Sequence, residues 1–95
     1  MAVKTIIKRR VRKGKEAQLL PLLLELRSRA ITQSGYISGE TLRNVDDPED
    51  YVVIGTWQSE EDWKAWKADK GRAEIQGKID ALLGEETTYA VYYHG

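Results

Sequence analysis

Three tryptophans near the middle of the chain are the residues best suited to hold a small aromatic molecule. Trp57, Trp63 and Trp66 lie close together in the sequence, and flat aromatic side chains can stack on a ring ligand while they keep water out. Large aromatic residues are also the ordinary filling of a small core. Both roles stay open for these positions. Other aromatic residues that could wall such a pocket are Tyr36, Tyr51 and Tyr89.

Three polar residues are candidates for handling charge on a ligand. Arg9 alternates with apolar residues and should point to the helix side of a sheet, where it could bind an anion or pair with a carboxylate such as Asp80. Gln76 lies at the edge of an apolar helix stripe, where its amide could hold an oxyanion or be solvated. His94 is the single histidine and a candidate general base, but a penultimate residue is usually frayed.

The composition excludes several other kinds of site. The 95 residues include no Cys and one His, which removes disulfides, thiolate catalysis and zinc sites that need sulfur or several histidines. Gly35 and Gly39 lack the Lys-Ser/Thr of a phosphate-binding loop. The acidic cluster at 46–50 lacks the spacing of a calcium loop and is interpreted as a solvated hairpin tip.

The charge is balanced overall but unevenly distributed. Residues 1–15 carry seven basic and no acidic side chains, so the remaining chain has eight basic and 15 acidic ones. A nucleic-acid-binding arm is one interpretation. We favour a structural strand without nucleic acid, because Val3, Thr5, Ile7 and Val11 alternate as in a half-buried strand and the whole domain is neutral.

Hydrophobic periodicity and turn residues predict one domain, residues 1–95, of alternating strands and helices. Ser59 should cap a short helix that carries Trp63 and Trp66, and Gly71 allows a break before the next helix. The predicted strands cover 2–12, 36–45, 51–58 and 86–94, and the predicted helices cover 15–33, a segment after Ser59, and about 72–83.

This order predicts an α+β fold of the ferredoxin-like, split βαβ type, with a four-stranded antiparallel sheet and helices on one face. The sheet is apolar on both faces, because Val52 and Ile54 oppose Val53. The long helix carries a second apolar stripe, Leu20, Leu24 and Ile31, beside its main one. A homodimer formed through the outer sheet face would cover the exposed apolar surface.

No segment approaches the length of a membrane span, and the basic start is not followed by the apolar stretch of a signal peptide. We therefore expect a cytoplasmic protein without a membrane partner.

The chain resembles the antibiotic biosynthesis monooxygenase family. The resemblance rests on Lys13-Gly14 before a long helix, Ser34-Gly35-Tyr36 at a strand, Trp57-Gln58-Ser59 entering a helix, and Trp63 to Trp66 within it. It implies a dimeric α+β barrel with a cleft between sheet and helices in each subunit. Some members oxygenate polycyclic phenols to quinones with molecular oxygen and without metal or flavin, and others bind and degrade haem.

The haem-degrading branch uses an Asn, a Trp and a His, which the resemblance places at Ile7, Trp66 and Gln76. Only the Trp is present, and Gln76 cannot ligate haem iron as an imidazole does.

The sequence thus predicts a cofactor-independent monooxygenase-like protein acting on a small aromatic or quinol-type molecule, with a non-catalytic ligand-binding or stress-related protein as the alternative. The catalytic candidates are Trp66, Gln76 and Arg9, and the candidates for substrate binding are Ile7, Trp57, Trp66, Tyr36 and Gln76.

Overall fold

The apolar alternation of the first strand places it at the centre of the sheet. In the computed structural model, which describes residues 1–94, β1 (Val3–Arg10) lies between β3 (Asp50–Trp57) and β4 (Thr88–Tyr93), and β2 (Tyr36–Arg43) pairs with the outer side of β3. All neighbouring strands are antiparallel. The order β2-β3-β1-β4 confirms the predicted α+β fold.

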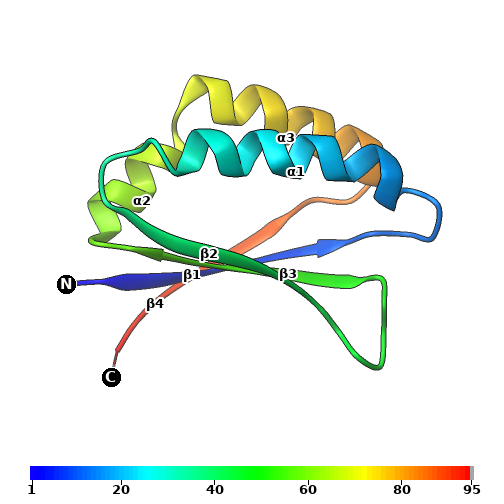
Figure 1. The fold of residues 1–95 in the computed structure, drawn as a ribbon, viewed down its shortest axis with the longest axis horizontal. Helices are drawn as coiled ribbons and strands as arrows, with labels where there is room; N and C mark the ends of the chain where they lie inside the picture. The colour runs from blue at the N-terminus through cyan, green and yellow to red at the C-terminus, as the bar shows by residue number, and fades with distance from the viewer. Residues whose placement is uncertain (95) are drawn as a thin grey trace.

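Three helices cover one face of this sheet (Figure 1). They are α1 (Glu16–Ala30), α2 (Glu60–Lys67) and α3 (Lys70–Leu83), and α1 runs beside α3 above the strands. The residues of β1 that face the helices, from Val3 to Arg9 at every second position, are all buried. This is the inward face that the alternation predicted.

The two shorter helices begin at side-chain caps. The Ser59 hydroxyl accepts a hydrogen bond from the Asp62 backbone amide at 3.1 Å, as the sequence predicted for the start of α2. The Asp69 carboxylate accepts one from the Arg72 amide at 2.9 Å, and α3 begins directly after it. The predicted break at Gly71 is therefore wrong: this glycine lies in the first turn of α3, and the Asp69 cap sets the boundary.

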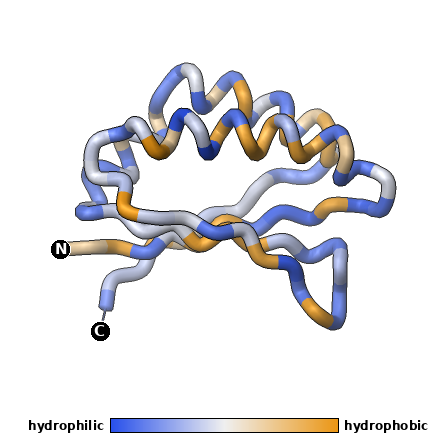
Figure 2. Tube along the Cα trace, in the orientation of Figure 1, coloured by the Kyte–Doolittle hydropathy of each residue, from blue (hydrophilic) through white to orange (hydrophobic). Residues whose placement is uncertain are grey.

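Apolar side chains also lie on surfaces that no helix covers. Hydrophobic segments recur along both α1 and the crossing strands (Figure 2). Register places Ile6 beside Ile54 on the outer face of the sheet, away from the helices. On α1 the predicted second stripe is uncovered, with Leu20, Leu24 and Ile31 each 56–60% exposed. Two separate apolar surfaces thus remain open to solvent in the single chain.

The basic first strand is balanced by acids from later in the chain. The Arg10 guanidinium contacts Asp47 at 2.9 Å and Glu49 at 3.2 Å in the β2–β3 hairpin, and Arg12 contacts Glu85 at 3.4 Å. Hydrogen bonding to Arg10 holds the pKa of Asp47 below its usual value. These pairs agree with the interpretation of this segment as a structural strand.

None of the helices within residues 1–94 is long and apolar enough to cross a membrane.

The turn into β2 provides a test of the fold. Gly35 has φ +84°, and a Cβ there would overlap the Asp62 carboxylate at the start of α2. We expect Gly35→Ala to lower the free energy of unfolding by more than about 2 kcal/mol, because backbone strain and displacement of Asp62 act together. Urea denaturation followed by tryptophan fluorescence measures the change.

Gly77→Ala is the matched control. Gly77 is exposed within α3 and a Cβ there meets nothing within 4 Å. Because alanine is the better helix former, this variant should gain up to about 1 kcal/mol. Equal effects of the two substitutions would contradict the proposed role of Gly35.

Candidate functional site

Trp57 is the centre of an aromatic cluster at one end of the sheet. Its ring lies 5.4 Å from that of Tyr36, 6.1 Å from Trp63 and 6.5 Å from Trp66, measured between ring centroids. The three tryptophans are 2–5% exposed. The end of β3, the start of β2 and the whole of α2 are held together by this cluster, since each contributes a ring to it.

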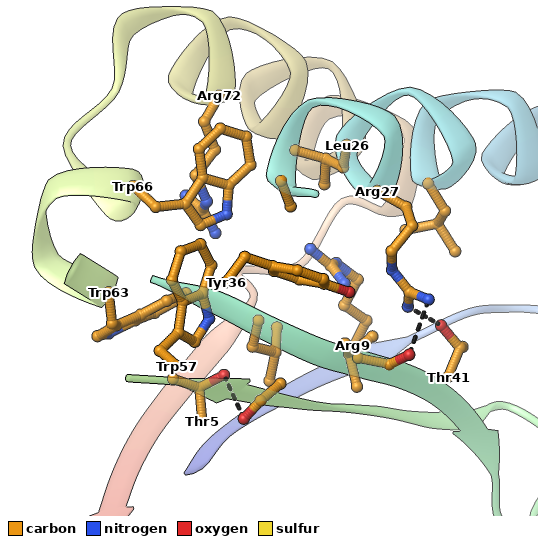
Figure 3. Close-up of a pocket in the computed structure, with 16 residues that line it drawn as sticks. Thr5, Arg9, Leu26, Arg27, Tyr36, Thr41, Trp57, Trp63, Trp66 and Arg72 are labelled. Atoms are coloured by element: carbon orange, nitrogen blue, oxygen red, sulfur yellow. Dashed lines mark hydrogen bonds between the residues drawn. The ribbon is translucent and has the colours of Figure 1, made fainter. Parts of the chain in front are cut away.

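A pocket lies between the sheet and α1, next to this cluster (Figure 3). It holds about 540 Å³ of empty space, including the part open to solvent. Its wall is mainly aromatic and aliphatic, with a few polar groups, as is usual for sites that bind small organic molecules. The residues that line it are Thr5, Ile7, Arg9, Leu23, Leu26, Arg27, Ala30, Tyr36, Gly39, Thr41, Val53, Gly55, Trp57, Trp63, Trp66 and Arg72.

Five of the six residues named as catalytic or substrate-binding candidates meet at this pocket. Ile7 and Arg9 reach it from β1, Tyr36 from β2, Trp57 from β3 and Trp66 from α2. They come from four separate elements, so only the fold brings them together. Trp66 and Ile7 line the pocket and do not fill it.

The sixth residue, Gln76, lies behind the wall. It is 7% exposed, so it is not solvated. It is also not among the residues that line the pocket. Its carbonyl oxygen accepts a hydrogen bond from Arg9 Nη2 at 2.9 Å, and its amide nitrogen donates to Asp80 at 2.9 Å and to Thr87 at 2.8 Å. These bonds fix the orientation of the amide, so Gln76 acts on the pocket by holding Arg9.

Arg9 reaches Asp80 only through this glutamine, which corrects the expected direct pairing. The Arg9 side chain is 5% exposed, and its Nε has no hydrogen-bond partner within residues 1–94. Burial lowers the pKa of Arg9 to about 10; the nearby Arg72 charge acts in the same direction, whereas Tyr89 and Asp80 raise the pKa. Arg9 therefore remains a cation at neutral pH, and its hydrogen-bond acceptor within residues 1–94 is the neutral Gln76 amide.

Two further arginines at the pocket were missed in the sequence. Arg72 is 4% exposed, donates to the Tyr89 hydroxyl at 2.9 Å, and lies over the rings of Tyr89 and Trp63. Arg27 donates to the Gly39 carbonyl at 3.0 Å and to Thr41 at 3.3 Å. Helical spacing is the sequence feature that identifies Arg72, because this residue stands three positions before the buried Ile75.

Two glycines of the sheet let polar groups approach the pocket. A Cβ at Gly39 would lie 3.0 Å from the Tyr36 hydroxyl and 3.5 Å from Cζ of Arg27, so these two groups meet over this residue. A Cβ at Gly55 would lie 2.7 Å from the Thr5 hydroxyl. Larger residues at either position would take up space beside the pocket.

Within residues 1–94 the pocket wall contains no histidine, aspartate or glutamate. His94 is exposed beyond the end of β4 and does not line it. The polar part of the wall consists of guanidinium and hydroxyl groups, which donate hydrogen bonds and stabilise negative charge.

A family model described as antibiotic biosynthesis monooxygenase matches residues 2–78. The chain belongs to the antibiotic biosynthesis monooxygenase family. The matched range includes every residue of the pocket wall. A comparison with curated proteins gives no match.

Solved structures share the fold of this monooxygenase family member. A conserved protein from Methanosarcina mazei matches with a TM-score of 0.91 at 19% identity, over 100% of this chain and 94% of that chain. SnoaB, a cofactor-independent oxygenase from Streptomyces nogalater, matches with a TM-score of 0.86 at 17% identity, over 99% and 93%. Rv0793 from Mycobacterium tuberculosis matches with a TM-score of 0.86 at 15% identity, over 100% and 96%.

The contributions of Arg9 and Gln76 to the free energy of unfolding should be coupled, because the two side chains are hydrogen-bonded to each other. Gln76→Leu leaves Arg9 Nη2 without its acceptor beside an already unpartnered Nε, so it should cost about 1–3 kcal/mol of unfolding free energy. In an Arg9→Met background the same substitution should cost clearly less. Urea denaturation of the two single variants and the double variant measures the coupling energy.

The exposed pair Arg10 and Asp47 is the control cycle. It also joins an arginine donor to a side-chain oxygen at 2.9 Å, but the acceptor is a carboxylate and both side chains are 40–45% exposed. Solvent screening should make its coupling smaller than that of Arg9 and Gln76. Additive effects at Arg9 and Gln76 would show that Gln76 does not hold Arg9.

Proposed function

We propose that this protein is a cofactor-independent monooxygenase that acts on a small aromatic or quinol-type molecule in the pocket between sheet and α1. The observation that carries the proposal is the wall itself, where Tyr36, Trp57 and Trp66 surround a space bounded on its polar side by guanidinium groups. Membership of the monooxygenase family and the fold shared with the cofactor-independent oxygenase SnoaB support it.

The residues present suit oxidation of an electron-rich ring. An ionised phenol or enol gives an electron to oxygen more readily than the neutral form does, and guanidinium groups stabilise such an anion. In the overall reaction a ring CH₂ and O₂ give a ring carbonyl and water, so one oxygen atom enters the product and the other leaves with the two hydrogens. The aromatic wall excludes bulk water from the oxidised ring.

A second candidate is a dimer of the same fold that binds a small ligand without chemistry. It is favoured by one observation, the lack of His, Asp and Glu among the described residues that line the pocket, because most enzymes use one of these as a proton acceptor. Haem degradation is not supported: Gln76, at the position of the family's histidine, is bonded to Arg9, Asp80 and Thr87 behind the wall.

Oxygen uptake separates the two candidates. The protein is mixed with a panel of anthrones and hydroquinones in air-saturated buffer, and oxygen consumption and product absorbance are recorded. We expect at least one substrate to react at least about tenfold faster than in buffer alone. Rates equal to buffer across the panel would favour the non-catalytic candidate.

A pair of variants ties any activity to the pocket. Leu23 lines the pocket from α1, so Leu23→Trp should fill part of the space and lower kcat/KM at least about tenfold. Lys78 is exposed on α3 and does not line the pocket, so Lys78→Trp adds the same side chain without this effect. Equal rates in both variants would place the activity elsewhere.

The second part of the proposal is a homodimer through the outer face of the sheet. Ile6, Val52 and Ile54 form an apolar centre on that face, with Lys4 and Lys8 beside it. Glu40 is paired with Ile54 and faces the same way. A two-fold pairing would cover the centre with its own copy and bring acidic and basic residues of opposite subunits within reach.

Sedimentation of two charge variants tests which apolar surface forms the dimer. Ile54→Glu puts a carboxylate at the centre of the outer face and should give a monomer at micromolar concentration, because an unpaired charge would be buried on association. Leu20→Glu changes the exposed stripe of α1 and should leave the dimer intact. A monomeric unmodified protein, or a dimer lost only in Leu20→Glu, would contradict the proposal.

A further inference from the structure

The pocket wall carries three positive charges and no negative one among the described residues. Arg9 extends from β1, Arg27 from α1 and Arg72 from α3, and the other lining residues are neutral. Figure 3 shows the three guanidinium groups around the same hollow as the aromatic rings. A ligand in this space is therefore surrounded by positive potential from three elements.

No carboxylate within residues 1–94 forms an ion pair with any of these arginines. Their hydrogen-bond acceptors are all neutral: the Gln76 amide for Arg9, the Tyr89 hydroxyl for Arg72, and the Gly39 carbonyl with Thr41 for Arg27. The ion pairs that the structure does form use other arginines and lysines. Asp80 acts on Arg9 across the Gln76 amide and does not contact the guanidinium directly.

Two of these unpaired guanidinium groups are among the most buried polar groups of the chain. Arg9 is 5% exposed and Arg72 is 4% exposed, and Nε of Arg9 has no partner within residues 1–94. Burying a charge without a directly contacting counterion is unfavourable. Asp80, which is bonded to Gln76, offsets part of this cost for Arg9, whereas the like charge of Arg72 adds to it. Such an arrangement becomes favourable when a ligand supplies the missing negative charge.

We propose that the pocket selects its ligand as an anion, an aromatic ring carrying a carboxylate or an ionised hydroxyl. Arg9 donates hydrogen bonds to the charged oxygen, Arg27 and Arg72 add electrostatic attraction, and the ring packs on Trp57 and Trp66. This refines the substrate class of the pocket given in the proposed function and rests on it for the identity of the site.

The same arrangement explains how the pocket could work without a general base. If an ionised hydroxyl binds ten times more tightly than the neutral group, linkage lowers the pKa of the bound hydroxyl by one unit. The proton passes to water and the electron pair stays on the ligand oxygen, so no side chain has to accept a proton. Gln76 is the positioning residue that keeps Arg9 directed at the ligand.

Binding of two isosteric probes tests the proposal without turnover. 2-Naphthoate and 2-naphthamide have the same ring and nearly the same shape, but only the first is charged at pH 7. Isothermal titration in low salt should give at least about tenfold tighter binding for naphthoate, and added salt should reduce the difference. Equal affinities, or no binding of either probe at millimolar concentration, would overturn the proposal that the ligand group is a carboxylate.

A second probe examines the ionised hydroxyl. Only the ionised form of 4-nitrophenol absorbs strongly in the visible range, so a pH titration with excess protein reports the pKa of the bound hydroxyl. We expect this pKa to fall by at least about one unit. A fall here with equal naphthoate and naphthamide affinities identifies an ionised hydroxyl as the ligand group, whereas naphthoate preference alone identifies a carboxylate. The absence of both effects overturns the proposal.

Variants assign the effect to the named arginines. Arg9→Met should remove most of the preference for naphthoate over naphthamide and leave naphthamide affinity unchanged, and Arg9→Lys should restore part of the preference. Arg27→Met removes a charge from a half-buried position and should weaken naphthoate binding severalfold. This variant keeps the proposal testable if the Arg9 variants fail to fold. Arg12→Met is the control, because Arg12 is exposed and pairs with Glu85. Unchanged preference in both Arg9→Met and Arg27→Met would overturn the proposal.

The two proposals fail in different ways. Anion preference without oxygen uptake leaves a binding protein with the ligand class proposed here. Oxygen uptake without anion preference keeps the monooxygenase and removes the role of the arginines.

Discussion

The packing of aromatic rings around Trp57 is the interaction on which the architecture of the site depends. Trp57 ends β3 and is almost fully buried, with the rings of Tyr36, Trp63 and Trp66 around it. Because large, rigid rings occupy this end of the sheet, α2 is anchored there. The same rings that stabilise the fold on one side form the wall of the pocket on the other. Core filling and ligand binding are therefore not alternatives for these residues.

Electrostatics gives the pocket its chemical character. The exposed arginines of the basic first segment, Arg10 and Arg12, find carboxylates in the hairpin and after α3. Arg9, one residue away, points to the opposite face, where its hydrogen-bond acceptor among the described residues is the neutral Gln76 amide. The two-residue period of the strand thus separates a solvent-screened, paired charge from a buried, unpaired one. This separation makes a neutral domain locally positive at the site where a ligand would enter.

Much of the fold could be predicted because its local signals agree with one another. The alternation of Val3, Thr5 and Ile7 identified the inward face of β1, and Ser59 identified the start of α2. The predicted start of α3, near residue 72, is two residues late, because Asp69 caps the helix and Gly71 lies within its first turn. A side-chain cap satisfies free backbone amides at a helix start, whereas one glycine is tolerated within a helical turn.

Patterns along the chain are sufficient to predict the order of the elements, the faces of the strands, and the presence of more apolar surface than one layer of helices can cover. These properties follow from periodicity along the chain, which is local. The folded chain was needed to place Gln76 behind Arg9, and to bring Arg27 and Arg72 together with Arg9 around one pocket. Those relations depend on how helices far apart in the chain are placed over the sheet, and that placement is set by packing of the whole core, which no single segment encodes.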